Sequence, residues 1–271
     1  MSAIDTLFEK LKTEHRKAFM PFLTAGDPDL EFTCQVIREF ARRGCAMCEL
    51  GVPYSDPIAD GPVIQASYAR ALEQGIRLED ICRAIAPVAV DAKMPIVNMV
   101  SYAIVYRYGL ERYVEKARLA GLAGAIVPDL PWEEAARLAE ICRRADFSLV
   151  QLITPTTPLD RALRIADLAT GFVYYVSVTG ITGERTELPA DILENVTRLR
   201  EHIRLPICIG FGISKPTHVR MLAPVADGLI VGSAIVRRMA QAAQRPRDAV
   251  LAELGVYVDQ LLAALHAAES A

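Results

Sequence analysis

A glutamate inside an apolar run is the first candidate for chemistry in this sequence. Glu49 follows Ala46-Met47-Cys48 and is the one acidic residue of that run. Burying a carboxylate is costly unless it is solvated, paired or kept neutral, and a carboxyl with a raised pKa works well as a general acid and base near neutral pH. Alternation along a strand puts Glu49 on the face of Met47, opposite Cys48, and leaves open which face is interior. The alternative is an outward-facing glutamate paired with an arginine.

A second carboxylate follows in the next segment of the chain. Asp60 stands directly before Gly61-Pro62 and a helical pattern, so it is either an active-site residue or an ordinary helix N-cap. Asp27 and Asp56 each precede a proline, a pattern typical of turns, and each could instead contact a partner.

Small residues at two later positions indicate a phosphate site. Gly210-Phe211-Gly212 and Gly232-Ser233 each follow a strand-like run, and the backbone N–H groups of such turns can hold an anion. The Ser233 hydroxyl and the N–H of Gly183 could add further donors. Tight turns without a ligand are the alternative interpretation of these glycines.

The positions of the histidines and lysines narrow the chemistry further. None of the four histidines stands at the end of a strand-like run, so no histidine-rich metal site is expected. No lysine ends such a run either, because Lys215 lies in the loop beyond, and a Schiff-base aldolase would lack its amine. What remains is carboxylate acid–base chemistry on a phosphorylated small molecule.

The six cysteines favour a structural role. Cys45 and Cys48 have the spacing of a redox or zinc motif, but Cys48 lies in an apolar run and no second such pair exists. We therefore predict that all six are buried small side chains with free thiols, as in a reducing compartment.

Eight runs of strand-like sequence are spaced so as to position these groups. Their starts are on average about 30 residues apart, the length of one strand–helix repeat, and helical patterns fill the gaps. Most runs are nearly continuous in apolar character, as expected for strands covered on both faces. The predicted strands are Ala18–Thr24, Ala46–Val52, Pro95–Val100, Gly124–Pro128, Phe147–Thr154, Gly171–Val178, Pro206–Gly210 and Asp227–Gly232.

This repeat predicts an α/β protein, a (β/α)8 TIM barrel formed as a single domain by residues 1–271. Additional helices are expected before the first strand, after the last, and at Val63–Glu73 and Leu78–Val90 between the second and third. An open doubly wound sheet is the alternative. In a barrel the active site lies at the C-terminal ends of the strands, where the candidate carboxylates and glycines stand.

Composition limits the class of protein. The chain has 271 residues, 52% hydrophobic and 23% charged, which excludes a disordered chain and allows a large core. The net charge is −3 without a basic block, so no nucleic-acid partner is expected. We expect no membrane span, because no apolar run approaches about 20 residues. The start lacks the layout of a signal peptide, so a cytoplasmic location is expected, or a plastid if a transit peptide has been removed.

The segment Glu49–Pro62, with the sequence ELGVPYSDPIADGP, resembles the signature of the tryptophan synthase alpha subunit family. The resemblance continues in collinear order over essentially the whole chain. Tyr54 stands where phenylalanine is usual in that family, and Ser101–Ile104 is unusual. The other matching segments are Pro21–Pro28, Val127–Pro131, Val176–Gly183, Gly210–Ile213 and Val231–Ser233.

The resemblance implies retro-aldol cleavage of indole-3-glycerol phosphate to indole and glyceraldehyde 3-phosphate. Glu49 would be the general acid–base, Asp60 would stabilise charge at the indole N–H, and Tyr174 would lie beside Glu49. The segment Ser177–Leu188 would be a lid that excludes water. Substrate contacts would come from Phe22, Val100, Tyr102, Ile126, Thr182, Gly183, Phe211, Gly212, Gly232 and Ser233.

The family also implies a partner. A tryptophan synthase beta subunit, holding pyridoxal phosphate, would bind the strand-six loop and Pro53, Asp56 and Pro57, giving an α2β2 heterotetramer. This chain itself is expected to hold no cofactor and no metal. The alternatives are a stand-alone lyase that releases free indole, a catalytically silent barrel that activates the beta subunit, and a different phosphate-binding barrel enzyme such as an isomerase or epimerase.

Overall fold

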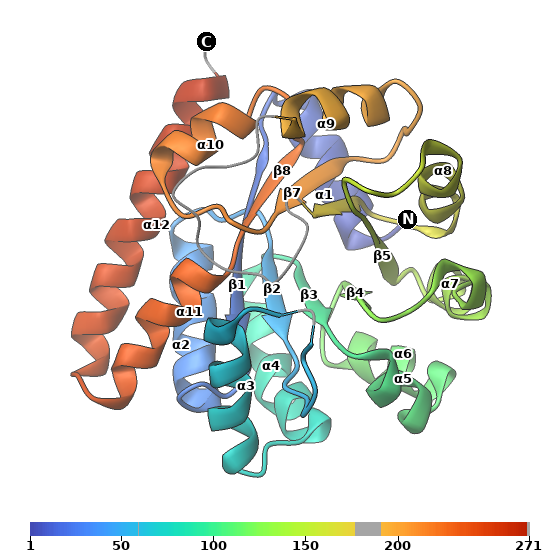
Figure 1. Cartoon of the computed structure of the whole chain (residues 1–271). Helices are drawn as coiled ribbons and strands as arrows, with labels where there is room; N and C mark the ends of the chain where they lie inside the picture. Colours follow the sequence, from blue (N-terminus) through green and yellow to red (C-terminus); the bar gives the residue numbers. More distant parts are fainter. Residues whose placement is uncertain (59, 177–190, 270–271) are drawn as a thin grey trace.

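The computed structural model describes residues 1–58, 60–176 and 191–269. Eight parallel strands form a closed barrel in sequence order, with β1 pairing with both β2 and β8 (Figure 1). This confirms the predicted barrel and excludes an open doubly wound sheet. The strands are β1 (Ala18–Thr24), β2 (Cys48–Gly51), β3 (Ile96–Met99), β4 (Gly124–Ile126), β5 (Ser148–Ile153), β6 (Val173–Val176), β7 (Ile207–Gly210) and β8 (Gly228–Val231).

Helices surround the barrel, and several are additional to the eight repeats. Among the described residues, one α-helix precedes β1, two lie between β2 and β3, two lie between β3 and β4, and two follow β8. The helices are α1 (Ala3–Thr13), α2 (Leu30–Arg42), α3 (Pro62–Glu73), α4 (Leu78–Ala92), α5 (Tyr102–Tyr108), α6 (Leu110–Leu119), α7 (Ala136–Arg144), α8 (Leu159–Leu168), α9 (Ile192–Arg200), α10 (Pro216–Leu222), α11 (Ser233–Met239) and α12 (Arg247–Glu269), with the short 3-10 helices η1 (Trp132–Glu134) and η2 (Ala240–Ala243).

Strand alternation divides the core into two layers and orients Glu49. Met47 packs with Met20 and Phe22 in the cluster that fills the barrel interior, whereas Cys48 packs in the outer cluster between the strands and the helices. Because side chains alternate along a strand, Glu49 shares the inward face of Met47. Phe22 of β1 is its register partner across the sheet.

The N-terminal helix closes one end of the barrel. Ile4 and Phe8 of α1 belong to the interior cluster, and the ring of Phe8 lies 5.8 Å from that of Phe172. The hydroxyl oxygens of Ser2 and Ser148 are 2.7 Å apart, which ties the start of α1 to β5. Ile4 and Phe8 therefore fill the barrel interior at the N-terminal ends of the strands.

Helix α12 corrects one expectation from the sequence. It is long and apolar enough, by length and composition only, to cross a membrane, although no such run was expected. Half of its most apolar window is buried, and α12 packs against α2, α10 and α11 at the outside of the barrel (Figure 1). Its apolar residues are therefore explained by packing in the outer core.

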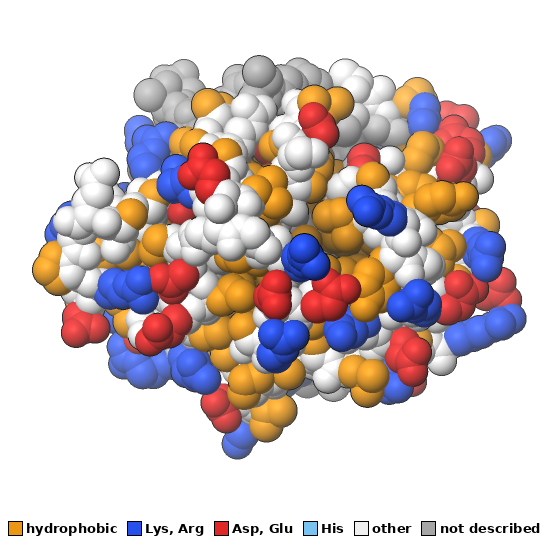
Figure 2. Space-filling model, turned by 90° about the horizontal axis from the view of Figure 1, so that it is seen from below, with side chains coloured by type: hydrophobic (Ala, Val, Ile, Leu, Met, Phe, Trp, Pro, Cys, Tyr) orange, Lys and Arg blue, Asp and Glu red, His pale blue; other side chains and the backbone are white. Residues whose placement is uncertain are grey.

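Charged side chains of both signs are mixed on the surface. Figure 2 shows Lys and Arg side chains interspersed with Asp and Glu over one face of the molecule.

All six cysteines are buried with free thiols, and burial raises the pKa of Cys45 and Cys48 above the ordinary thiol value. The prediction that they are buried small side chains is confirmed.

Candidate active site

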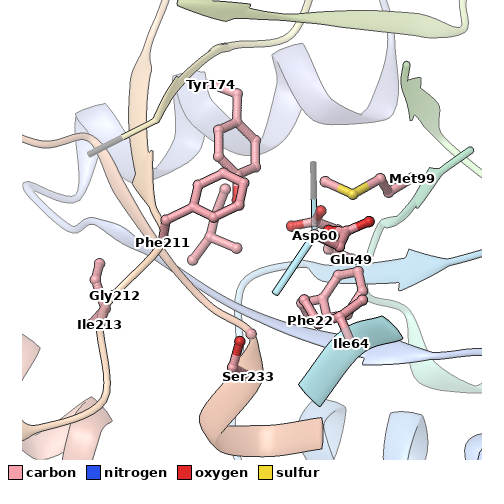
Figure 3. Close-up of a pocket in the computed structure, with 12 residues that line it drawn as sticks. Phe22, Glu49, Asp60, Ile64, Met99, Tyr174, Phe211, Gly212, Ile213 and Ser233 are labelled. Atoms are coloured by element: carbon pink, nitrogen blue, oxygen red, sulfur yellow. The ribbon is translucent and has the colours of Figure 1, made fainter. Parts of the chain in front are cut away.

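A cavity opens at the C-terminal end of the barrel, with about 430 Å³ of space between protein atoms, part of it open to solvent (Figure 3). Its walls come from β1, β2, β3, β6 and β8, from α3 and α11, and from the loops that follow β2, β7 and β8. The lining residues are Phe22, Glu49, Asp60, Ile64, Met99, Tyr174, Phe211, Gly212, Ile213, Ile230, Gly232 and Ser233.

Glu49 lies at this cavity as a buried carboxyl. Its side chain is 1% exposed, and neither carboxyl oxygen has a hydrogen-bond partner among the described residues. Burial, and then the charge of Asp60, raise the pKa of Glu49 to about 8. The carboxyl is therefore mainly protonated at neutral pH and can donate a proton. The alternative of an outward glutamate paired with an arginine is wrong.

Asp60 is brought to the same cavity and is not a helix cap. The N-cap of α3 is Gly61, one residue after Asp60. Asp60 is 6% exposed, and burial raises its pKa to about 6. Figure 3 shows its carboxylate beside that of Glu49. Because the two pKa values are separated, near pH 7 the pair holds mainly one proton, on Glu49, and one charge, on Asp60.

Tyr174 of β6 forms another wall. Burial, followed by the charges of Glu49 and Asp60, raises its pKa well above the ordinary tyrosine value, so its hydroxyl keeps its proton. Its ring packs against that of Phe211, with the centroids 5.6 Å apart. A Cβ at Gly210 would collide with the Tyr174 hydroxyl. Glycine at this position therefore gives Tyr174 its space, besides any role in the turn.

Four of the five residues predicted to bind phosphate line the cavity: Phe211, Gly212, Gly232 and Ser233. Phe211 and Gly212 have consecutive left-handed backbone conformations, with φ of 72° and 75°. Gly232 is the N-cap of α11 and Ser233 its first residue. In Figure 3, Gly212 and Ser233 lie apart from Glu49 and Asp60 among the residues that line the cavity. Backbone amides and a hydroxyl at this place suit an anion.

Other predicted contacts lie elsewhere. Ile126 belongs to the barrel interior but does not line the cavity, and Val100 packs in the outer cluster. Tyr102 starts α5, where its backbone N–H donates to the Asp129 carboxylate at 2.7 Å. Thr182 and Gly183, and the proposed lid over residues 177–188, lie outside the described residues.

Four cavity residues were not predicted from the sequence. They are apolar. Strand alternation was the signal for Met99 and Ile230, and it places Met99 rather than its neighbour Val100 on the inward face, whereas Ile64 lies on α3 and Ile213 in the loop after β7. The four are Ile64, Met99, Ile213 and Ile230.

The loop between β2 and α3 carries the predicted partner residues. Pro53 is buried, Pro57 is half-buried, and Asp56 is exposed and accepts a hydrogen bond from the Ser55 hydroxyl at 2.6 Å. Ile58 is 88% exposed.

Asp27, in the loop after β1, does more than close a turn. It is 1% exposed, and its two carboxylate oxygens accept hydrogen bonds from Nε and Nη2 of Arg70.

Comparison with known proteins points to one family. The model of the family described as tryptophan synthase alpha chain matches residues 8–266. The tryptophan synthase alpha chain of Rhodopirellula baltica is 56% identical over 251 residues, which cover 92% of this chain and 90% of the relative. That of Geotalea daltonii is 43% identical over 241 residues, covering 89% and 91%.

Solved structures give the same result. A chain of Mycobacterium tuberculosis tryptophan synthase superposes with a TM-score of 0.88 at 29% identity, covering 97% of this chain and 98% of the other. A chain of the tryptophan synthase complex from Pyrococcus furiosus gives a TM-score of 0.83 at 34% identity, covering 92% and 99%.

Proposed function

Because this chain belongs to the tryptophan synthase alpha chain family, we propose that it cleaves indole-3-glycerol phosphate to indole and glyceraldehyde 3-phosphate in a retro-aldol reaction. The observation that carries the proposal is the pair of buried carboxyls at one cavity, Glu49 and Asp60, whose pKa values are raised to about 8 and about 6, mainly by burial. This pair offers a proton and a negative charge at the same pH, which is what the reaction requires.

The shape of the cavity supports an orientation of the substrate. Phe22, Ile64 and Met99 form an apolar wall next to the carboxylates and suit the indole ring. Gly212, Gly232 and Ser233 suit the phosphate. The glycerol chain would then extend from the indole site to the phosphate site, with the hydroxyl on its first carbon near Glu49.

The reaction starts with transfer of the Glu49 proton to indole C3. The nitrogen lone pair of the ring shifts into the ring as C3 is protonated, which leaves positive charge at the indole N–H. The Asp60 carboxylate stabilises that charge. At the end of this step Glu49 is a buried carboxylate with no hydrogen-bond partner in the described part of the chain, and therefore a good base.

Cleavage then uses the same glutamate as the base. Glu49 removes the proton of the hydroxyl on the carbon attached to indole C3. The O–H electrons form the aldehyde carbonyl, the C–C bond breaks, and its electrons return to the ring and neutralise the nitrogen. Glu49 is again protonated, so the cycle consumes no cofactor. A glutamate suits this double task because its flexible stem can reach both atoms.

The direct test is release of indole from indole-3-glycerol phosphate by the purified chain. Formation of indole and glyceraldehyde 3-phosphate in equal amounts supports the proposal. Consumption of this substrate without indole, or turnover of an isomerase substrate instead, contradicts it.

A carboxylate placed at Gly232 should weaken substrate binding. A Cβ there would lie 3.7 Å from the Phe22 side chain, an ordinary contact, so Gly232→Asp should fold. At about 4 Å and an effective dielectric of about 20, two like charges repel by about 4 kcal/mol. We expect KM for the phosphorylated substrate to rise at least about 100-fold. The neutral control Gly232→Asn should raise KM far less, and equal KM values for wild type and Gly232→Asp would place the phosphate elsewhere.

We also propose that a tryptophan synthase beta subunit, which would hold pyridoxal phosphate, docks at the mouth of this cavity and receives the indole. The support is the exposure of Asp56 and Ile58 in the loop that leads to Asp60. Gln65 of α3 donates to the backbone carbonyls of Pro57 and Asp60 at 3.2 and 2.8 Å, so movement of this loop would reach the site.

Asp56→Ala separates a partner contact from a structural role. If Asp56 pairs with a basic residue of the partner, the variant should lose most of the mutual activation by the beta subunit and keep its basal indole release. The control Asp91→Ala, an exposed carboxylate paired with Arg38, should keep both. Loss of basal activity and thermal stability together would instead make Asp56 a turn residue. A wild-type chain that neither binds nor responds to a beta subunit would be a stand-alone lyase.

A further inference from the structure

A buried tyrosine behind the cavity has no role in the reaction described above. Tyr68 of α3 is 1% exposed, and its hydroxyl has no hydrogen-bond partner among the described residues. We propose that Tyr68 is a positioning residue: with substrate bound, its hydroxyl donates a hydrogen bond to the Asp60 carboxylate and holds that carboxylate against the indole N–H. This inference rests on the proposed function.

The position of the Tyr68 hydroxyl follows from Gly51. A Cβ at Gly51 would lie 2.7 Å from that hydroxyl and 2.6 Å from Cζ of Phe22. Gly51 stands two residues after Glu49 on β2, so the two share the inward face of the strand. The hydroxyl therefore takes the place of the next inward side chain beyond Glu49, against the ring of the cavity residue Phe22.

Helix α3 presents Tyr68 to the site. Ile64 lies one turn earlier on the same face of α3 and lines the cavity beside Phe22 (Figure 3). The neighbours of Tyr68 tie this helix to the end of β1. The Ser67 hydroxyl lies 2.6 Å from that of Thr24, and Arg70 holds the buried Asp27 carboxylate with bonds of 2.6 and 2.8 Å. Because these contacts hold helix α3 in place, the Tyr68 hydroxyl is suited to fixing the position of the Asp60 carboxylate.

The charges around Tyr68 point to Asp60 as its acceptor. Burial raises the pKa of Tyr68 well above its ordinary value, and the charges that add to this are those of Asp60, then Tyr54, then Glu49. The phenol therefore stays a donor at any working pH. Glu49 must change its protonation state twice in each cycle, whereas Asp60 serves as a fixed counter-charge. A hydrogen bond that persists through the cycle therefore requires Asp60, rather than Glu49, as the acceptor.

Tyr68→Phe removes the hydroxyl and keeps the ring, which packs against that of Tyr54 at 5.6 Å. Tyr68 does not line the cavity, so KM should stay within about twofold while kcat falls about tenfold, the loss expected for one hydrogen bond to a charged group. The control Tyr113→Phe removes an equally buried hydroxyl, which accepts from Asn98 at 2.7 Å in the outer layer, and should leave kcat unchanged.

The pH dependence of kcat gives a readout that a structural role would not change. Among the described residues, the titratable groups facing Asp60 are Glu49 of β2, Tyr54 of the preceding loop, Tyr68 of α3 and Tyr174 of β6. A donor to the carboxylate favours its charged form, so removing the donor raises the pKa of Asp60. The rising limb of kcat in Tyr68→Phe should therefore move up by about one pH unit, and that of Tyr113→Phe should not move.

The outcomes separate this inference from the proposed function. A wild-type chain that releases no indole contradicts the proposed function itself. An active wild type with unchanged kcat and pH limb in a folded Tyr68→Phe overturns the role of Tyr68 alone. If Tyr68→Phe does not fold, a fluorinated tyrosine at position 68 keeps the hydroxyl and makes it a stronger donor. The rising limb should then move to lower pH, and an unmoved limb would equally overturn the inference.

Discussion

Glu49→Gln is expected to lower kcat for indole release by at least about 10³-fold, because the amide keeps the shape of the side chain and cannot transfer protons in either direction. General acid–base groups commonly contribute about 10²–10⁴-fold, and here one group serves two proton transfers. KM should change little, since the phosphate and indole contacts come from other residues of the cavity. Indole release near the wild-type rate would remove Glu49 from the mechanism.

The stability of this variant provides the control. Glu49 has a pKa of about 8 in the folded chain, raised by burial and the Asp60 charge, against an ordinary value of 4.5. The folded state therefore binds this proton more tightly, and the wild type loses up to about 1.4 kcal/mol of unfolding free energy per pH unit between the two values. The amide that replaces the carboxyl does not titrate. Thermal melts should show equal Tm values near pH 4.5 and a more stable variant near pH 8, whereas a less stable variant at pH 8 would indicate a damaged fold.

Asp60→Asn should lower kcat by about 10²–10³-fold, the range seen when one group that stabilises transition-state charge is removed. Asparagine is as good a helix N-cap as aspartate, but Gly61 is the cap of α3, so the fold should be unaffected. The measurement is steady-state indole release together with a thermal melt. Full activity in Asp60→Asn would show that its charge is not used.

The pH profile makes the Asp60 prediction sharper. For the wild type, kcat/KM should rise as Asp60 ionises, with its burial-raised pKa of about 6, and fall as Glu49 loses its proton, with a pKa of about 8. In Asp60→Asn the rising limb should disappear. The falling limb should move to lower pH, because the Asp60 charge no longer raises the pKa of Glu49. A falling limb that stays in place would contradict the coupling of the two carboxyls.

Much of this protein is determined by local sequence. The eight apolar runs became eight strands, with ends that shifted by at most two residues, because a strand buried on both faces needs a continuous apolar run. Glu49 was conspicuous because a carboxylate in such a run must have a special environment. Glycine and serine after the seventh and eighth strands indicated a phosphate site, since only small residues leave the backbone amides accessible there.

Only the tertiary structure decided how these residues meet. The face of Glu49 depends on which side of β2 lies inside the closed barrel, and closure is a property of all eight strands. The local sequence was compatible with Asp60 as the N-cap of α3, but in the folded chain Gly61 is the N-cap. The loop after β2 instead buries Asp60 beside Glu49, where burial among residues from distant segments raises both pKa values. Met99 rather than Val100 lines the cavity, and the hydroxyl of Tyr68 occupies the space left by Gly51, because contacts between remote residues are fixed by packing rather than by spacing along the chain.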